Sequence, residues 1–413
     1  MTMFGLSENE ITPLLTALAG RDVDRDEQAE LFARAAWTGI AEPGDRPAGV
    51  LLSTLGAPEA LRAVLDPPDP VVLVERLREA GADDVTPEEA GKALERWTPR
   101  VTSAAAVLAL RQAARVGARL LIPDDEFWPS GLDDLEGHAP PALWVRGADA
   151  ALAALSRSIA LVGARAATGY GEHVTMEASA GLVDRGYAIV SGAAYGIDGM
   201  AHRAALASDG TTVAFLAGGV DRFYPSGHDA LLTTIARHGA VVSELPCGQP
   251  PTKWRFLQRN RLIAAASLAT VVIEAGWRSG SLNTAGHASA LGRPLGAVPG
   301  PVTSAASAGC HRLIRDFTAL CVTNPDEMAE LASPPSATDG TAEGVGQGQT
   351  SDTTRLLDAL SIRAPRDSAD VAARSGLSLA TVRGLLGRLA LDGVAAERER
   401  GWVKVVPKTE TSG

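Results

Sequence analysis

Four cations and two aromatic rings stand within nine residues of this chain. The stretch PPTKWRFLQRNR contains no acid, and its charged and aromatic side chains are Lys253, Trp254, Arg255, Phe256, Arg259 and Arg261. Lysine and arginine bind phosphate oxygens and aromatic rings stack on bases, so the combination is typical of single-stranded nucleic acid binding. The alternative is a solvated basic face whose two rings belong to the core. The residue types alone favour neither interpretation.

Three turns rich in glycine and hydroxyl groups each follow an apolar run. The first is GARAATGYG from Gly163, the second is SGAAYGID up to Asp198, and the third is EAGWRSGSLNTA, with Ser279, Gly280 and Ser281. Such turns let backbone amides approach a phosphate at the start of the next helix. The spacing is not GxGxxG and no ribose-binding acid follows, so a dinucleotide cofactor is disfavoured. The alternative is that the glycines serve only close packing of helix on sheet.

No catalytic or metal-binding motif accompanies these turns. The chain has no GxxxxGK[ST], HExxH or GxSxG sequence and no histidine pair with metal-ligand spacing. Its three cysteines, at 247, 310 and 321, form no CxxC pair. We therefore predict no catalytic residue, no metal and no cofactor, and we expect Asp198 and Glu274 to cap helices or hold turns.

The elements that must position these turns predict an α/β domain. Apolar runs without alternation are separated by amphipathic helices, which favours a parallel sheet covered on both faces. The strand candidates are ARLLIP, SIALVGA, YAIVSGA, TTVAFLAGG, AVVSELP, TVVIEAG and PLGAVPG. Because the carboxyl ends of parallel strands meet at one edge, the three turns should converge on a single crevice. We predict an extended Rossmann-like domain over 117–331, with the basic cluster in a loop and first helical turn before a core strand.

Three further segments flank this domain. Residues 1–110 show only helical periodicity, and LLSTLGAPEALRAVL suggests a SAM-like or helix-hairpin-like module that binds either a DNA backbone or, as we favour, a protein. Residues 332–350 have the composition of a flexible linker. Residues 351–407 predict a winged helix, whose third helix, 378–391, serves either as a second DNA contact or as a protein-binding element.

The acidic charge of the chain is concentrated in its first third. The chain has 38 basic and 49 acidic residues, a net charge of −11. Residues 1–150 hold 14 basic and 26 acidic side chains, residues 151–330 hold 14 and 13, and the rest hold 10 of each. This distribution excludes a wholly basic nucleic-acid protein but permits a local polyanion site. No apolar run is long enough to cross a membrane and no basic leader begins the chain, so we expect a cytoplasmic protein with no membrane partner.

Together, these motifs resemble the DNA-processing protein A family, also called DprA or Smf. The resemblance covers about 124–331 and includes ALVGARAATGYG, SGAAYGIDGMAHRAAL, LAGGVDRFYP, QRNRLIAAAS and EAGWRSGSLNTAGHA in the family's order. It implies a non-catalytic protein that binds single-stranded DNA, dimerises and loads the RecA recombinase on incoming DNA in natural transformation. Single-strand binding protein is a further candidate partner.

The resemblance also implies a set of site residues. By motif, Arg165 matches the arginine of the family's VGSR turn. The DNA pocket around the family's RNR motif corresponds to Lys253, Phe256, Arg259 and Asn260, and Gly192 of the second turn lines the same pocket by position. The implied DNA-binding residues are Arg165, Gly192, Lys253, Phe256, Arg259 and Asn260. Additional candidate DNA or phosphate contacts are Gly163, Trp254, Arg255, Arg261, Ser279, Gly280 and Ser281.

The chain departs from the family's motifs at two positions of the expected pocket. Ala164 stands where the family usually has serine, and Tyr195 where it usually has arginine. A rival hypothesis is a nucleotide-processing enzyme, since nucleoside-monophosphate phosphoribohydrolases share the Rossmann-like architecture. Their PGGxGTxxE signature is matched neither by LAGGVDRFYP nor by EAGWRSGSLNTA.

Overall fold

The computed structural model describes residues 8–333, 352–391 and 393–405. The chain divides into two compact units, Met1–Pro334 and Pro335–Gly413. The predicted linker lies, from residue 334 onward, outside the described residues.

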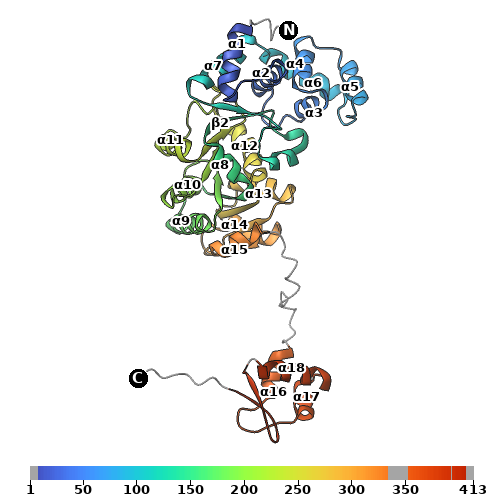
Figure 1. Cartoon of the computed structure of the whole chain (residues 1–413), viewed down its shortest axis with the longest axis vertical. Helices are drawn as coiled ribbons and strands as arrows, with labels where there is room; N and C mark the ends of the chain where they lie inside the picture. The colour runs from blue at the N-terminus through green and yellow to red at the C-terminus, as the bar shows by residue number, and fades with distance from the viewer. Residues whose placement is uncertain (1–7, 334–351, 392, 406–413) are drawn as a thin grey trace. The chain divides into compact units, whose positions relative to one another are not determined.

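The first unit begins with a helical region. Its helices, at the blue end of Figure 1, are α1 (Glu8–Ala19), α2 (Arg25–Ile40), α3 (Arg46–Leu55), α4 (Ala57–Leu65), α5 (Pro70–Glu79), α6 (Pro87–Trp97) and α7 (Ser103–Arg115). No single helix among the described residues is long and apolar enough to cross a membrane. The pair α3 and α4 reaches that length and composition together, but it bends by 118° at the break between the two helices.

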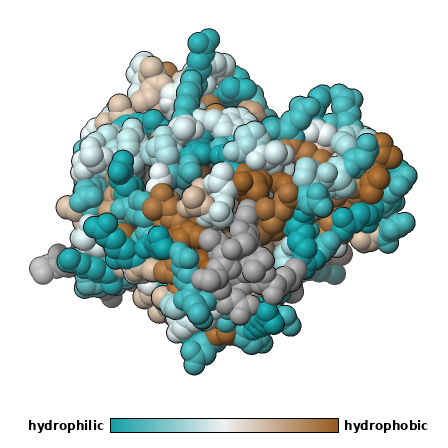
Figure 2. All heavy atoms as spheres, turned by 90° about the horizontal axis from the view of Figure 1, so that it is seen from above, coloured by the Kyte–Doolittle hydropathy of each residue, from teal (hydrophilic) through white to brown (hydrophobic). Residues whose placement is uncertain are grey.

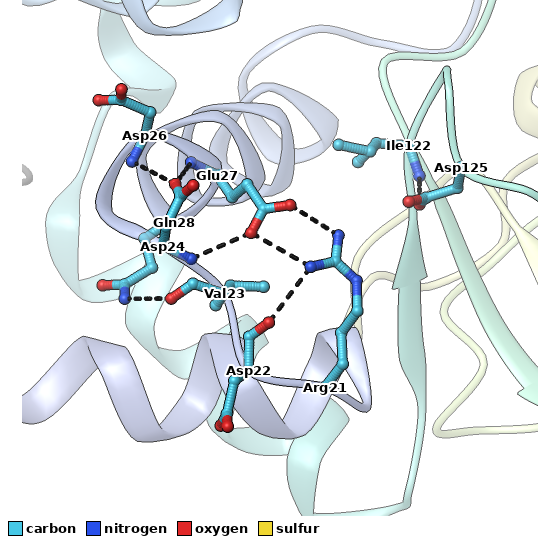
Figure 3. Close-up of polar contacts among 9 residues, drawn as sticks. All are labelled: Arg21, Asp22, Val23, Asp24, Asp26, Glu27, Gln28, Ile122 and Asp125. Atoms are coloured by element: carbon cyan, nitrogen blue, oxygen red, sulfur yellow. Dashed lines mark hydrogen bonds and ion pairs between the residues drawn. The ribbon is translucent and has the colours of Figure 1, made fainter.

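The start of α2 shows how the sequence sets a helix boundary. The Asp24 carboxylate accepts hydrogen bonds from the backbone amides of Asp26 and Glu27, each at 2.9 Å, and the Glu27 carboxylate accepts from the Asp24 amide at 3.0 Å (Figure 3). Arg21 donates to both oxygens of Glu27 and ties the preceding turn to the helix. This reciprocal cap satisfies amides that a helix leaves without partners, and a cap of this kind contributes about 1 kcal/mol.

A nine-stranded sheet follows, in the order β1-β2-β6-β5-β4-β3-β7-β8-β9. The strands are β1 (Arg119–Leu121), β2 (Leu143–Gly147), β3 (Ser158–Gly163), β4 (Ala188–Ser191), β5 (Thr212–Phe215), β6 (Ala240–Ser243), β7 (Ala269–Glu274), β8 (Leu295–Ala297) and β9 (Leu320–Cys321). The strands from β6 to β9 in this order pair in parallel, whereas β1 and β2 are antiparallel additions at one edge. The predicted Rossmann-like parallel sheet is confirmed, and β2 and β9 are strands that the sequence analysis does not predict.

Helices cover both faces of the sheet (Figure 1). They are α8 (Asp149–Ala153), α9 (Gly169–Asp184), α10 (Ile197–Ala207), α11 (Asp229–His238), α12 (Lys253–Ala265), α13 (Ser281–Ala290), α14 (Ala308–Asp316) and α15 (Pro325–Leu331). Successive strand residues point to opposite faces, so β3 places Ile159 and Leu161 against α9 and α10 but Ala160 and Val162 in the cluster that contains α12 and α13. This two-sided burial explains why the strands read as continuous apolar runs.

The helical region and the sheet share one apolar cluster. Leu15, Trp37 and Leu110 belong to the same cluster as Val241 of β6 and Leu232 of α11. The helical region from residue 8 to residue 110 is therefore packed onto the sheet. Seen from the end of the unit that carries this region, the surface is mainly hydrophilic with separate apolar patches (Figure 2). Val71 of α5 and Leu108 of α7 are about half exposed.

The second unit has the predicted order of a winged helix. Helices α16 (Asp352–Ala359), α17 (Ser368–Ser375) and α18 (Leu379–Leu391) precede an antiparallel hairpin of β10 (Ala395–Arg398) and β11 (Gly401–Lys404). Its apolar core contains Leu356, Val371, Val382, Leu386 and Leu389. The predicted arrangement of three helices and a two-stranded wing is confirmed.

Candidate functional site

A cavity of about 940 Å³ opens at the carboxyl ends of β3 and β7. In the strand order, β4, β5 and β6 follow one another outward from β3 in one direction. The next strand along the chain, β7, pairs with the opposite edge of β3. This reversal is the position where open α/β sheets bind ligands. All three predicted turns contribute to the cavity wall: the first through Gly163 to Ala166, the second through Ala194 and Asp198, and the third through Gly276 and Arg278 to Ser281. Their predicted convergence is confirmed.

Aromatic rings and exposed cations meet in this cavity. Arg165 lies over the ring of Phe256, with its guanidinium carbon 4.9 Å from the ring centroid, and the Tyr224 ring lies 5.7 Å from Phe256. Lys253, the first residue of α12, and Arg278 also line the cavity and are exposed. The site therefore combines positive charge, which binds phosphate groups, with a half-buried aromatic ring, on which a nucleic acid base can stack.

The Arg259 guanidinium is built into the wall of the cavity. Arg259 is only 5% exposed, and its Nη1 donates to the carbonyl oxygens of Gly192, at 2.7 Å, and Phe215, which stand at the ends of β4 and β5. Burial lowers the pKa of Arg259 to about 10, while the nearby Asp198 carboxylate opposes that shift. Arg259 thus stays charged at neutral pH and fastens α12 to the strand ends.

Two buried carboxylates occupy the turns expected to cradle phosphates. Asp198 accepts a hydrogen bond from the Gly192 amide at 3.2 Å, and burial raises the pKa of its carboxyl against the opposing effect of Arg259. Glu274 accepts from the Thr168 amide at 2.9 Å and from the Thr168 hydroxyl at 2.7 Å. The turn-holding role expected of both acids is observed. Since these amides are already engaged, a phosphate in the cavity depends mainly on side chains.

The glycines of the first turn permit close packing. A Cβ at Gly163 would lie 2.6 Å from the side chain of Ile197, and one at Gly171 would lie 2.5 Å from the Glu274 carboxylate. Neither position can hold a side chain without movement of its neighbours. The packing interpretation of these glycines therefore holds at both positions.

Most of the predicted site residues line the cavity, and four do not. Those in the wall are Gly163, Arg165, Lys253, Phe256, Arg259, Asn260, Ser279, Gly280 and Ser281. Asn260 is 8% exposed and donates to the Asn283 side chain at 3.1 Å. Gly192, Trp254, Arg255 and Arg261 are not among the residues that form the wall.

The prediction that the basic cluster lies in a loop and first helical turn is wrong. The cluster lies in the full helix α12, and Arg255, Arg259 and Arg261 are at most 6% exposed. Arg261 forms a salt bridge with Glu244 at 2.7 Å and donates to the His138 carbonyl. Arg255 forms a two-pronged ion pair with Glu42 of the helical region, at 2.8 and 3.0 Å. Burial is tolerated because each guanidinium has a charged or carbonyl partner.

The Glu42–Arg255 pair should make stability depend on pH. Burial alone would raise the pKa of Glu42, but Arg255 and Arg100 outweigh it and hold that pKa below its ordinary value of 4.5. Because the folded-state pKa is the lower one, the carboxylate stabilises the fold above pH 4.5, and this contribution disappears as the pH falls through the folded-state pKa. Glu42 is 37% exposed, so solvent reduces the effect.

We expect Glu42→Gln to lower the free energy of unfolding by about 1 kcal/mol at pH 7 and by less as the solution is acidified. Urea denaturation of both proteins between about pH 3 and 7 measures this difference. If the difference in unfolding free energy between the two proteins is the same at every pH, the Glu42–Arg255 ion pair does not cause it and the prediction is wrong.

Among the exposed side chains of the cavity, a cation and an aromatic ring are not predicted as site residues from the sequence. Arg278 belongs to the third turn and Tyr224 to LAGGVDRFYP, and both are more than one-third exposed at the cavity wall. The signal for Arg278 was its place beside Ser279 in a turn already selected. Tyr224 had no local signal, because the contact between its ring and Phe256 joins segments that are distant in the sequence.

Comparison with known proteins places the chain in a family. The family model described as DNA recombination-mediator protein A matches residues 119–333, more than half of the chain. A DprA relative from Mycobacterium tuberculosis strain H37Rv is 48% identical over 301 residues, which cover 70% of this chain and 77% of that protein. The chain belongs to the DNA-processing protein A family. The recognition made from its motifs is confirmed.

Other members of the DNA-processing protein A family extend the similarity. Protein Smf of Escherichia coli K12 is 42% identical over 212 residues, 51% of this chain and 56% of that protein. The X-ray structure of DNA processing protein A from Streptococcus pneumoniae superposes with a TM-score of 0.56 at 27% identity, over 72% of this chain and 95% of that one. The fold and the family are therefore supported independently.

Proposed function

We propose that this protein binds single-stranded DNA in the cavity at the ends of β3 and β7. The observation that carries the proposal is the position of two exposed cations, Arg165 and Lys253, beside the half-buried ring of Phe256 in that cavity. Membership of a family of DNA recombination mediators agrees with it.

The chemistry of binding follows from the side chains. Arg165, Lys253 and Arg278 contact phosphate oxygens, and a base stacks on Phe256, where Tyr224 extends the aromatic surface. Every base has a flat face that can stack, so binding tolerates most sequences. Duplex DNA keeps its bases paired and stacked, which denies them to Phe256, so the cavity selects single strands.

Arg259 and Asn260 act behind the contact surface. Their hydrogen bonds to the strand ends and to Asn283 fix the rotation of α12, and therefore the direction in which Lys253 and Phe256 point. Gly192 contributes its carbonyl oxygen to this support. Ser279 and Ser281, whose hydroxyls lie 2.7 Å apart, offer further hydrogen bonds to a phosphate at the opposite wall.

The wider role that we propose is that of a recombination mediator. The protein protects incoming single strands in the cytoplasm, loads the RecA recombinase on them during natural transformation, works as a homodimer, and meets DNA coated by single-strand binding protein. We divide the work among a helical domain over 1–110, the DNA-binding domain over 117–331, a linker over 332–350 and a winged helix over 351–407. RecA filament assembly on coated DNA, followed with and without the protein, tests this role.

We also propose that the protein is not an enzyme. Glu274 is the buried acid of the third turn that we compare with a catalytic glutamate. Both of its carboxylate oxygens accept hydrogen bonds from Thr168. We expect Glu274→Gln to lower the free energy of unfolding by about 1–3 kcal/mol, because a neutral amide oxygen is a weaker acceptor than the carboxylate and only one of the two glutamine head atoms can accept from Thr168. Urea denaturation measures this loss. Release of free base from a panel of nucleotides by the parent, abolished in Glu274→Gln, would instead support the nucleotide-processing alternative.

Fluorescence anisotropy of labelled oligo-dT with the full chain tests the binding proposal. The affinity should fall as salt rises, with a slope of about −0.7 per phosphate contact in a plot of log affinity against log salt. Unlabelled duplex of the same length should compete poorly. If oligo-dT fails to bind, or if duplex displaces it equally well, the proposal is wrong.

A further inference from the structure

Helix α12 begins between two hollows of the surface. Lys253 lines the central cavity, whereas the next residue, Trp254, lines a second hollow of about 380 Å³. Neighbouring residues of a helix point about 100° apart, which explains how one turn serves both. The other walls of the second hollow come from the helical region. They are residues 42–45 after α2, the first two residues of α3, the end of α6 with Arg96 and Trp97, and Arg100 just beyond it.

The Trp254 indole is the exposed apolar surface of this hollow. It is 55% exposed, whereas Trp97 in the opposite wall is 2% exposed. Within the described ranges, no ring or guanidinium stacks on Trp254. Stacking of this indole on a flat ligand is energetically favourable, because it buries an aromatic face that is otherwise exposed to water.

Three arginines line the same hollow as the indole, and each forms an ion pair with one acid. Arg96 pairs with Asp45 at 3.2 Å and Arg100 with Glu42 at 2.6 Å. Arg46 pairs with Asp84. The arginine side chains remain 30–53% exposed. A guanidinium has five N–H donors, so each can still donate to a ligand.

The acids in the hollow are held by these partners. Asp45 also accepts from the Trp97 indole at 3.0 Å, and Glu42 accepts from Arg255 as well as Arg100. With the charged partners counted, four arginines face three carboxylates and one positive charge is left in excess, although residues 1–150 carry a large excess of acids; the groups are Arg46, Arg96, Arg100 and Arg255 against Glu42, Asp45 and Asp84. The local charge thus complements an anion, unlike that of the region as a whole.

We propose that single-stranded DNA leaves the central cavity across the first turn of α12 and continues into this second hollow. One base stacks on Trp254, and Arg46, Arg96 and Arg100 contact the adjoining phosphates. A nucleic acid strand is the occupant because the hollow combines an exposed indole with cations and adjoins the DNA cavity. The inference rests on the proposed function, and it gives the helical region a direct part in binding longer strands.

The test compares oligo-dT of about 4 to about 16 nucleotides on the full-length protein and its variants. We expect Trp254→Ala and Arg96→Ala to bind the shortest oligonucleotides like the parent and the longest ones about 5- to 100-fold more weakly. Trp254→Phe keeps a stacking surface and should retain most of the affinity. Lys92→Ala is the matched control for Arg96→Ala, because it removes one exposed cation from α6 outside the hollow.

A modified oligonucleotide tests the stacking itself. Abasic sites at the positions beyond the shortest binding length should weaken binding to the parent but not to Trp254→Ala, because only the parent has an indole for those bases to contact. If the abasic sites cost the same affinity in both proteins, the bases do not contact Trp254 and the inference is wrong.

The outcomes separate this inference from the proposed function. Equal loss at every length in Trp254→Ala would indicate damage to α12 rather than a second contact, and would overturn the inference. Parent-like binding by Trp254→Ala and Arg96→Ala, with loss in Lys253→Ala, would refute the second hollow and leave the central cavity standing. If the parent binds no oligonucleotide of any length, both proposals fail.

Discussion

Replacing Arg165 and Lys253 together with alanine should weaken single-stranded DNA binding by about 100-fold or more. Both side chains are exposed at the wall of the central cavity, which Phe256 also lines. A hydrogen bond to a charged group contributes about 1.5–3 kcal/mol, so the loss of two phosphate contacts removes about 3–6 kcal/mol. Anisotropy of labelled oligo-dT measures the affinity.

The same experiment on a salt series identifies the cause. Loss of two phosphate contacts should reduce the salt slope by about 1.4. The control is Lys92→Ala with Arg237→Ala, which removes two exposed cations that do not line the cavity. If the control loses as much affinity as the cavity variant, the net charge of the chain rather than the cavity determines binding.

Arg259→Ala should lower the free energy of unfolding by about 3–6 kcal/mol, because two buried carbonyl oxygens each lose a hydrogen bond from a charged donor, which contributes about 1.5–3 kcal/mol. The substitution leaves the Gly192 and Phe215 carbonyl oxygens without this donor and leaves Asp198 buried without its cation. Urea denaturation measures the loss. The weaker DNA binding that follows would reflect a displaced α12 and not a lost phosphate contact.

Arg165→Ala is the matched comparison, because it removes an arginine that is exposed in the same cavity. It should unfold like the parent while binding DNA more weakly. The contrary result is Arg259→Ala that unfolds like the parent and still loses DNA binding, which would mean that Arg259 contacts the strand directly.

Local patterns were sufficient to predict the sheet and the meeting of its turns. The runs at β3, β4 and β7 are continuous and apolar because both of their faces are buried, and parallel strands necessarily bring their carboxyl ends to one edge. β9 gave no such signal, since it has two residues and both are exposed. The antiparallel strand β2 lies toward the edge of the sheet and departs from the repeating strand–helix order.

Which side chains of the basic cluster line the cavity, and which are buried, could be predicted only in part. A helix that begins at Lys253 places Phe256 and Asn260 on the same face, three and seven residues later, and all three line the cavity. That periodicity was available in the sequence. The burial of Arg255, Arg259 and Arg261 was not, because their partners Glu42, Phe215 and Glu244 are 17 to 213 residues away.

Photo-crosslinking of a 5-iododeoxyuridine oligonucleotide to the full-length protein, with the linked peptides identified by mass spectrometry, tests the central claim most directly. The account predicts that the shortest oligonucleotide that binds crosslinks at Phe256 or Tyr224, whose rings meet in the cavity. Crosslinks confined to the winged-helix unit, or to helices of the first 115 residues, would place the DNA elsewhere and contradict it.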